Sequence, residues 1–255
     1  MRITFILPTT GDSAIGGVRV VCEYANRLKE KGHIVKVVYP LIHPRIGPRF
    51  SLRNVRFQAE MTWHDLKRGK KISWFTLKAE LVRIPTISPK FVKLVEKLVP
   101  DAEAVIATSW ETAYFVNKLA EKKGRKFYFV QHYEIWDLLD NEAFWKKAGE
   151  IEKDPNKLSL AIHDVVPEDE ELREMKRLVD DSYRMPLNKI TISSWLRELM
   201  EKKFGESVFG VIINGISFDV FYKQSVQKTG KRVLMPFKPF KLQKWKGTED
   251  GLKAF

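Results

Sequence analysis

The amino-acid sequence predicts an α/β protein built around a doubly wound parallel sheet. Short apolar stretches alternate with amphipathic helical stretches along most of the chain. The apolar stretches are continuous runs, which is typical of parallel strands buried on both faces. The first 39 residues also predict a strand, a helix and a second strand, and such a unit makes its two strands parallel.

This strand–helix–strand unit opens the chain. Residues 2–8 (RITFILP) form an apolar run that ends at a proline, and residues 33–39 (HIVKVVY) form a second one. The stretch 17–31 between them has apolar residues on one helical face and charged residues on the other. The positions expected to face the core are Val18, Val21, Cys22, Ala25 and Leu28.

The alternation continues along the chain. Further strands are expected at 72–77, 104–110, 189–194 and 208–215, and the stretch 126–134 is expected to start as a strand and run into a loop. Helices are expected at 89–99, 111–124, 167–184 and 195–205. In the helix at 89–99, the apolar spacing predicts inward positions for Phe91, Leu94, Val95 and Leu98.

These elements predict one domain over residues 1–218. Residues 219–232 are polar and basic without a period, which is typical of a linker. Residues 233–255 then begin a new strand and a new helix. One strand and one helix cannot bury their own apolar faces. This last segment therefore either packs back on the first domain or begins a second domain that the chain truncates.

The charge balance favours anionic partners. The chain carries 45 Lys and Arg residues against 32 Asp and Glu, a formal net charge of +13. Such a charge attracts phosphates, anionic lipid surfaces and nucleic acids. The alternative is that these charges only form a highly charged surface, as in thermophilic proteins.

Location in the cell is indicated by the N-terminus and by the single cysteine. The apolar run after Arg2 is too short for a secretory signal, and no stretch reaches the roughly 18 apolar residues of a membrane-spanning helix. Cys22 cannot form an internal disulfide, and its inward position indicates a core residue rather than a nucleophile. We expect a cytoplasmic protein that makes peripheral contact with the inner face of a membrane.

The loop 9–19 (TTGDSAIGGVR) is the first candidate site. It follows the first strand, and ligands of open α/β sheets bind at the carboxyl ends of the strands. Gly16 and Gly17 would let the backbone approach a phosphate or sugar at the start of the helix, where Arg19 adds a positive charge. The alternative is that the two glycines only allow a tight, well-packed turn. The spacing differs from GxGxxG, which disfavours a classical dinucleotide site.

Two more candidate sites follow later strands at the same edge. His132 and Glu134 lie in QHYE (131–134), and imidazole can exchange a proton near neutral pH. A structural role for the histidine is the alternative. Ser109 and Glu111 follow an earlier strand, where they could bind a hydroxylated substrate, or Ser109 could simply cap the next helix.

Other chemistry is poorly supported by the sequence. The histidines and the single cysteine have no metal-ligand spacing, and no Walker loop or GxSxG motif occurs, so we expect no metal cofactor. The segment 43–71 mixes many basic residues with Phe50, Phe57 and Trp63. Such a segment could bind single-stranded nucleic acid, lie on an anionic membrane, or form a solvated loop.

Four segments, taken in order, resemble a known family. They are GGVRVVCEYANRLKEKGHIVKVV near the start, QHYE, the stretch ITISSWLRELMEKKFGESVFGVIINGISFDVFY, and the final WKGTEDGLKAF. In this order they are similar to the GT-B glycosyltransferases of family 4 (glycosyl transferases group 1). The resemblance implies two Rossmann-like domains, of which the N-terminal one (residues 1–218) binds an acceptor and the C-terminal one binds a nucleotide-sugar. It also implies sugar transfer without a metal and with retention of anomeric configuration.

The resemblance assigns roles to particular residues. Gly16 and Gly17 would lie beside the donor phosphates and the transferred sugar, which His132 would contact. Lys246 would meet the diphosphate, and Asn214 of the ING sequence would contact substrate. Gln243 stands where the family has an arginine, and most of the C-terminal donor domain has no counterpart in the chain.

The sequence thus predicts the acceptor-binding half of a retaining, nucleotide-sugar-dependent glycosyltransferase that is inactive alone. Its expected partners are a nucleotide-sugar, a glycan or lipid-linked acceptor, and a membrane surface contacted through segment 43–71. The main alternative is a non-catalytic module that binds a glycan, a nucleotide or a partner chain. A nucleic-acid binder is less well supported.

Overall fold

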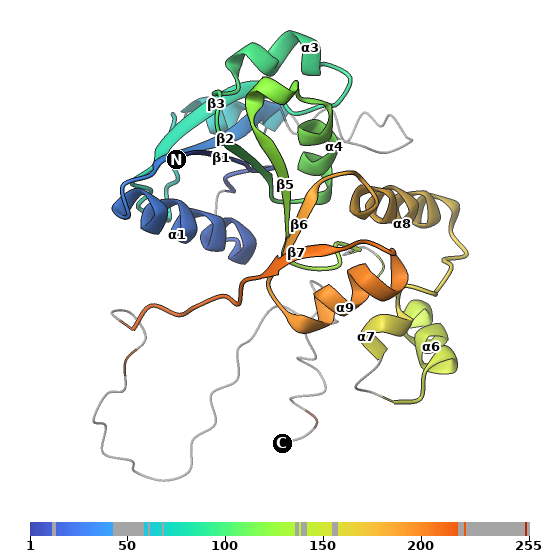
Figure 1. Ribbon diagram of the computed structural model, residues 1–255. Helices are drawn as coiled ribbons and strands as arrows, with labels where there is room; N and C mark the ends of the chain where they lie inside the picture. Colours follow the sequence, from blue (N-terminus) through green and yellow to red (C-terminus); the bar gives the residue numbers. More distant parts are fainter. Residues whose placement is uncertain are drawn as a thin grey trace. The chain divides into compact units, whose positions relative to one another are not determined.

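A seven-stranded parallel sheet forms the centre of the molecule, which confirms the predicted α/β fold (Figure 1). The computed structural model describes residues 1–11, 14–42, 59–60, 62–67, 69–135, 138, 142–154, 158–218, 222 and 253. The strands are β1 (Arg2–Ile6), β2 (Ile34–Ile42), β3 (Glu80–Thr86), β4 (Ala104–Ala107), β5 (Arg125–Val130), β6 (Asn188–Thr191) and β7 (Val208–Val211).

The strand order is β3-β2-β1-β4-β5-β6-β7. From β1 the chain first adds strands on one side and then, from β4 onward, on the other. Phe5 of β1 pairs with Val37 of β2 and with Ile106 of β4, so β1 lies in the middle of this reversal. In a doubly wound sheet, the crevice beyond the carboxyl ends of the strands at such a reversal is the usual ligand site.

Helices cover both faces of the sheet. α1 (Gly16–Glu30) lies on one side, and α4 (Trp110–Lys118) and α8 (Glu170–Tyr183) lie on the other (Figure 1). α9 (Ser194–Lys203) connects β6 to β7. Shorter helical segments are α3 (Val92–Val95), η1 (Glu96–Leu98) and η2 (Glu121–Lys123).

The core beneath α1 matches the sequence prediction. Val18, Val21, Cys22 and Ala25 are buried in one cluster with Phe5, and Leu28 packs against its margin. Burial raises the pKa of the Cys22 thiol to about 12, mainly because a thiolate would lose its solvation there. Cys22 is therefore a small core residue, as its helical position predicts.

The third strand differs from the prediction. Residues 72–77 form turns and irregular backbone, and the strand is β3, eight residues later. The side-chain amide of Asn26 on α1 donates to the Thr76 carbonyl at 2.9 Å, and its oxygen accepts the Lys78 N–H at 2.6 Å. These bonds satisfy the backbone of the segment without a neighbouring strand. The strand was not predicted because proline disfavours strands, but Pro85 is tolerated because β3 is an edge strand.

The predicted helix at 89–99 is shorter, and its buried face is different. Only Val92–Val95 and Glu96–Leu98 are helical, and the buried side chains are Val92, Val95 and Val99. The predicted inward positions are therefore wrong for three of the four residues. Phe91, Leu94 and Leu98 are exposed, because the valines one position along the chain occupy the core.

Residues 135–173 and 214–255 group into a second compact unit, whereas residues 1–134 and 174–213 form the unit that contains the sheet. The described part of the second unit includes α6 (Glu142–Ile151) and α7 (Leu158–Ala161). It also holds an open cavity of about 450 Å³, bordered by the ion pair between Lys147 and Glu168. Of the predicted linker 219–232 and the segment 233–255, only Tyr222 and Lys253 lie within the described residues, so both predictions stay open.

Candidate functional site at the carboxyl edge of the sheet

The backbone at the start of α1 does not require the glycine pair. Neither Gly16 nor Gly17 has a positive φ, so any residue could adopt their backbone conformation. A Cβ added at Gly16 would meet nothing within 4 Å, whereas one at Gly17 would lie 3.4 Å from Nε2 of Gln131. Ile15 occupies the N-cap and has no side-chain acceptor for the first N–H groups of the helix.

Gln131 connects this helix start to the neighbouring strands. Its side chain lies against Gly17, and its Nε2 donates to the Thr108 carbonyl at 3.5 Å. Gln131 follows β5 and Thr108 follows β4, so three segments that are distant in sequence meet beside the reversal of strand order. The structure thus brings together the first loop, the SWE segment and the QHYE segment.

Ser109 is the N-cap of α4. Its Oγ accepts the Thr112 N–H at 3.4 Å, and Oγ1 of Thr112 accepts the Ser109 N–H at 2.9 Å, which together form a capping box. Ser109 is 8% exposed. The capping role considered from the sequence is confirmed, and a contact between Ser109 and a substrate stays a prediction.

Glu134 and Glu111 form a carboxyl pair at the start of α4. Oε2 of Glu134 accepts the Trp110 N–H at 2.8 Å. Burial raises the pKa of Glu134 well above its usual range, and the nearby charge of Glu111 raises it further. Burial also raises the pKa of Glu111, although its own backbone N–H and Ser109 oppose the shift.

The coupling of these carboxyls is not apparent from the sequence, because 22 residues separate them along the chain. It arises because β4 and β5 are neighbours and both end at the same edge. Among the described residues, no lysine, arginine or histidine forms an ion pair with either carboxyl. Glu134 is buried, whereas Glu111 is half-buried.

His132 is half-buried between its own loop and α9. Its Nδ1 lies 2.7 Å from the Tyr133 carbonyl, and its ring meets Trp195 edge to face with centroids 5.9 Å apart. A carbonyl oxygen only accepts, so Nδ1 carries the proton and Nε2 is the acceptor atom of the neutral ring.

The backbone of the 131–134 segment is held by α8. The Tyr183 hydroxyl donates to the His132 carbonyl at 3.0 Å and accepts the Glu134 N–H at 3.1 Å. The Tyr133 hydroxyl donates to Asp180 at 2.6 Å, and Asp180 also pairs with Lys176 at 2.8 Å. Two aromatic side chains thus link the segment that bears His132 to a rigid helix.

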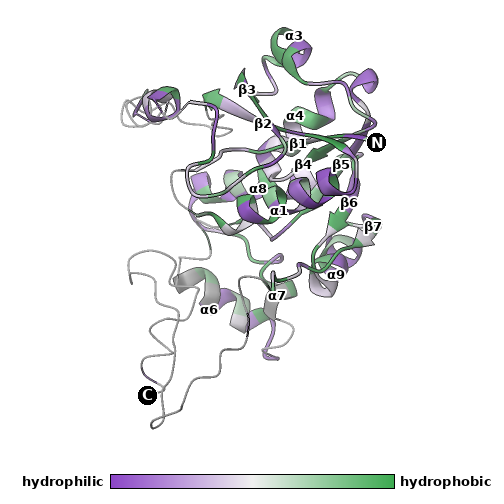
Figure 2. Cartoon of the chain, turned by 90° about the vertical axis from the view of Figure 1, so that its left-hand side faces the viewer, coloured by the Kyte–Doolittle hydropathy of each residue, from purple (hydrophilic) through white to green (hydrophobic). Residues whose placement is uncertain are grey.

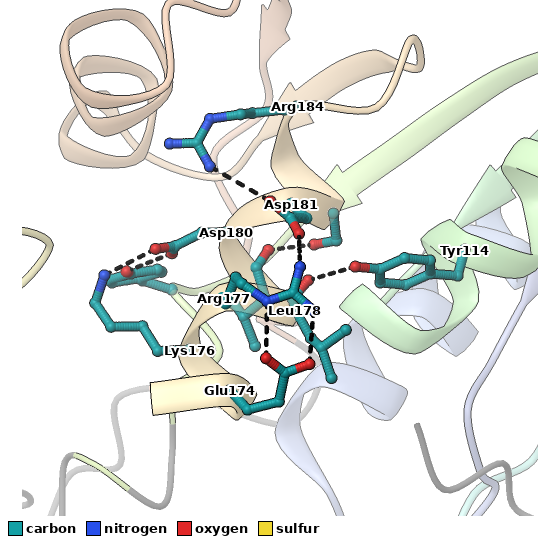
Figure 3. A network of polar contacts seen from close by, with 11 residues as sticks. Tyr114, Glu174, Lys176, Arg177, Leu178, Asp180, Asp181 and Arg184 are labelled. Carbon is teal, nitrogen blue, oxygen red and sulfur yellow. Dashed lines mark hydrogen bonds and ion pairs between the residues drawn. The ribbon is translucent and has the colours of Figure 1, made fainter. Parts of the chain in front are cut away.

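Figure 3 shows how the same helix is stabilised on its outer side. Arg177 donates to both oxygens of Glu174 and also pairs with Asp181. The Tyr114 hydroxyl of α4 donates to the Leu178 carbonyl at 2.9 Å. α8 therefore connects α4 with the 131–134 segment, and these are the two elements that carry the paired carboxyls.

The remaining predicted site residues are not brought into this group. Arg19 is exposed, and its ion pair is with Glu23 one turn along α1, at 3.9 Å. Asn214 belongs to the second unit, where its Oδ1 is buried without a hydrogen-bond partner among the described residues. Lys246 lies outside the described residues. In segment 43–71, Trp63 is exposed and Nζ of Lys67 lies 4.9 Å from the centre of its ring.

Comparisons with known proteins do not extend these observations. No family model matches the sequence, and no curated protein matches it. Within the described part of the chain, no group of three His, Cys, Asp or Glu residues is arranged to hold a metal ion. No helix in that part is both long and apolar enough to cross a membrane.

Proposed function

We propose that this chain is the acceptor-binding half of a retaining glycosyltransferase that uses a nucleotide-sugar. The observation that carries the proposal is the meeting of three predicted segments at the carboxyl edge of the sheet. Gly17, Thr108 and Gln131 come together beside the reversal of strand order. A family of this kind needs these segments together, because its sugar is transferred at the edge of the N-terminal sheet.

The uncapped start of α1 is suited to the anionic part of the donor. The open space at Gly16 and the lack of a capping side chain at Ile15 favour an approaching phosphate. In this proposal the rest of the donor site comes from a second domain. A donor site divided between two domains loses most of its binding when one is absent, so we expect no transfer by residues 1–255 alone.

His132 and the carboxyl pair act on the sugar side of the site. Nδ1 of His132 donates to the Tyr133 carbonyl, so in a neutral ring Nε2 would accept a hydrogen bond or stabilise positive charge that develops on the transferred sugar. We expect a sugar hydroxyl to reach Glu111 rather than Glu134, because Glu111 is half-buried and Glu134 is only 7% exposed. Segment 43–71 would hold a glycan or lipid-linked acceptor.

Ligand-observed NMR on the 255-residue chain tests the proposal. The probes are UDP-glucose, GDP-mannose, a short oligosaccharide and a polyprenyl-phosphate-linked sugar. We expect weak saturation transfer to the sugar protons of a nucleotide-sugar, reduced at least tenfold by Gly17→Leu, which would displace Gln131. The matched control is Lys122→Ala, an exposed lysine at the opposite edge. Sugar binding that is unaffected by Gly17→Leu would contradict the proposal.

Measuring kcat in an enzyme that has both domains tests catalysis separately from binding. In the native protein with its donor domain, His132→Ala is expected to lower kcat by about a hundredfold, the usual cost of removing one positioned acid–base or electrostatic group. An unchanged kcat would reduce His132 to a structural role. Sugar-nucleotide binding without transfer by any form of the protein would favour the non-catalytic module. Binding to single-stranded RNA that falls steeply with salt would favour a nucleic-acid binder.

A further inference from the structure

Residues 91–98, which include α3 and η1, carry an exposed apolar stripe. Phe91 is 50% exposed, Leu94 is 75% exposed and Leu98 is 51% exposed. Spacings of three and four residues place these side chains on one side of the α3–η1 segment. A second stripe, Val92, Val95 and Val99, is buried and anchors the segment to the sheet unit. The exposed stripe is therefore not needed to hold the segment in place.

A third stripe on the same segment consists of lysines. Lys90, Lys93 and Lys97 are exposed and have the same spacing as the exposed apolar residues. None of the three is ion-paired within the described part of the chain. Elsewhere on the surface, lysines pair readily with carboxylates, as Lys78 does with Glu30 at 2.5 Å. The segment therefore presents large apolar side chains beside lysines whose charge is not neutralised locally.

We propose that residues 90–98 form a membrane-docking surface that binds anionic lipids with the segment lying in the plane of the interface. Phe91, Leu94 and Leu98 would enter the boundary between headgroups and acyl chains, and the lysines would contact the phosphates. Apolar and lysine stripes side by side are what an interfacial helix requires. Figures 1 and 2 show α3 at the periphery of the sheet unit, where a flat surface can reach it.

Charge favours a lipid surface over a second copy of this chain. A symmetric contact through the segment would bring the lysines of both copies together, and like charges at an interface oppose association. An anionic bilayer pairs with the lysines and takes up the apolar side chains at once. The net charge of +13 adds long-range attraction to the same surface.

Vesicle co-sedimentation of the 255-residue chain tests the surface. The vesicles are pure phosphatidylcholine, or phosphatidylcholine with about one-third phosphatidylglycerol. We expect binding to the anionic vesicles only, weakened at least tenfold by Leu94→Asp. The triple change of Lys90, Lys93 and Lys97 to Gln should weaken it more strongly still, since each lysine near such a surface contributes roughly fivefold.

Matched controls separate this surface from general attraction of a basic protein. Changing Lys31, Lys118 and Lys146 to Gln removes the same charge from exposed positions elsewhere in the described part of the chain. Ile151→Asp places a carboxylate at another exposed apolar position, 52% exposed in the second unit. Both controls should keep at least half of the wild-type affinity, and all variants should melt within a few degrees of the wild type.

A fluorescent label measures insertion directly. Cys22 is buried and its thiol has a raised pKa, so a Leu94→Cys variant offers one reactive site for an NBD label. We expect a blue shift and a severalfold gain in emission when anionic vesicles are added. Binding with unchanged NBD emission would overturn the proposal. So would absence of vesicle binding, equal losses in the charge control, or a dimer in light scattering that Leu94→Asp converts to monomer.

Discussion

The two edges of the sheet differ in whether their buried ionisable side chains have a partner of opposite charge. At the amino edge, Lys123 is 4% exposed, and its Nζ donates to Asp101 and to the Val99 carbonyl, both at 2.7 Å. Lys189 is 2% exposed in its side chain and pairs in the same way with Glu206 and with a backbone carbonyl. Each buried cation there has a carboxylate and a carbonyl acceptor, so its charge is fully compensated.

At the carboxyl edge, burial instead raises the pKa values of the Glu111 and Glu134 carboxyls. The charge of Glu111 adds to the raised pKa of Glu134, and within the described residues no cation pairs with either carboxyl. A buried ion that has a partner of opposite charge needs no functional explanation. Buried carboxyls with raised pKa values occur often at functional sites. We therefore expect substitutions at the amino edge to change mainly stability, and substitutions at the carboxyl edge to change mainly ligand binding. Four substitutions test this division, and they follow in order of expected effect.

Gly124→Ala should have the largest effect on stability. Gly124 has φ +114, and an added Cβ would lie 2.6 Å from the Ala102 carbonyl oxygen. Backbone strain and this clash should together lower the free energy of unfolding by about 3 kcal/mol or more. Urea denaturation measures the loss, with Gly32→Ala as a control, since Gly32 has φ +85 but no atom near its Cβ position. Equal losses in the two variants would show that the close packing at this edge is unimportant.

Lys123→Met should lower the free energy of unfolding by about 2 kcal/mol, because the Val99 carbonyl loses its donor. Asp101 is exposed and can be solvated again. Lys123 holds the pKa of Asp101 below its usual value, so in the wild type this pair stabilises above the ordinary pKa and loses its effect as the pH falls. The variant should lack that acid dependence. A wild-type stability that is flat between pH 5 and pH 2 would contradict this account.

Glu134→Gln should stabilise the protein by about 1 kcal/mol at pH 7. The folded-state pKa of Glu134 is raised, so its contribution is fully present below the ordinary pKa and is lost as the pH rises toward the folded value. Glutamine keeps an oxygen for the Trp110 N–H and removes the charge. The gain in melting temperature should shrink at pH 4. If the variant is instead less stable at neutral pH, Glu134 is a compensated structural ion like those at the amino edge.

Gly16→Ala should change stability by less than about 0.5 kcal/mol. Its backbone is ordinary, and the added Cβ would meet nothing within 4 Å. Under the proposed function, the methyl group instead occupies space that a ligand needs, so sugar or phosphate binding should weaken while the melting temperature stays constant. A variant that binds normally would remove Gly16 from the site and leave Gly17 as the contact to Gln131.

Much of the fold could be predicted from the sequence, and the failures have local causes. The core face of α1 and the strands at residues 2–6 and 104–107 follow from apolar spacing, because these side chains are buried by their own neighbouring elements. The strand at Glu80–Thr86 was missed because Pro85 resembles a breaker, although an edge strand tolerates it. The inward face at 92–99 was misassigned because both stripes are apolar, and helical spacing alone cannot choose between them.

The sequence by itself determined the α/β class, the parallel strands, the helix that begins at Gly16 and the carboxyl-edge position of His132. These depend on composition and on spacing within a few turns of chain. Only the tertiary structure decided that Glu111 and Glu134 share one environment, that Gln131 lies against Gly17, and that Leu94 is exposed. Such facts depend on which strands become neighbours and which of two apolar faces a unit buries. Those outcomes are set by contacts between distant segments, which no local pattern specifies.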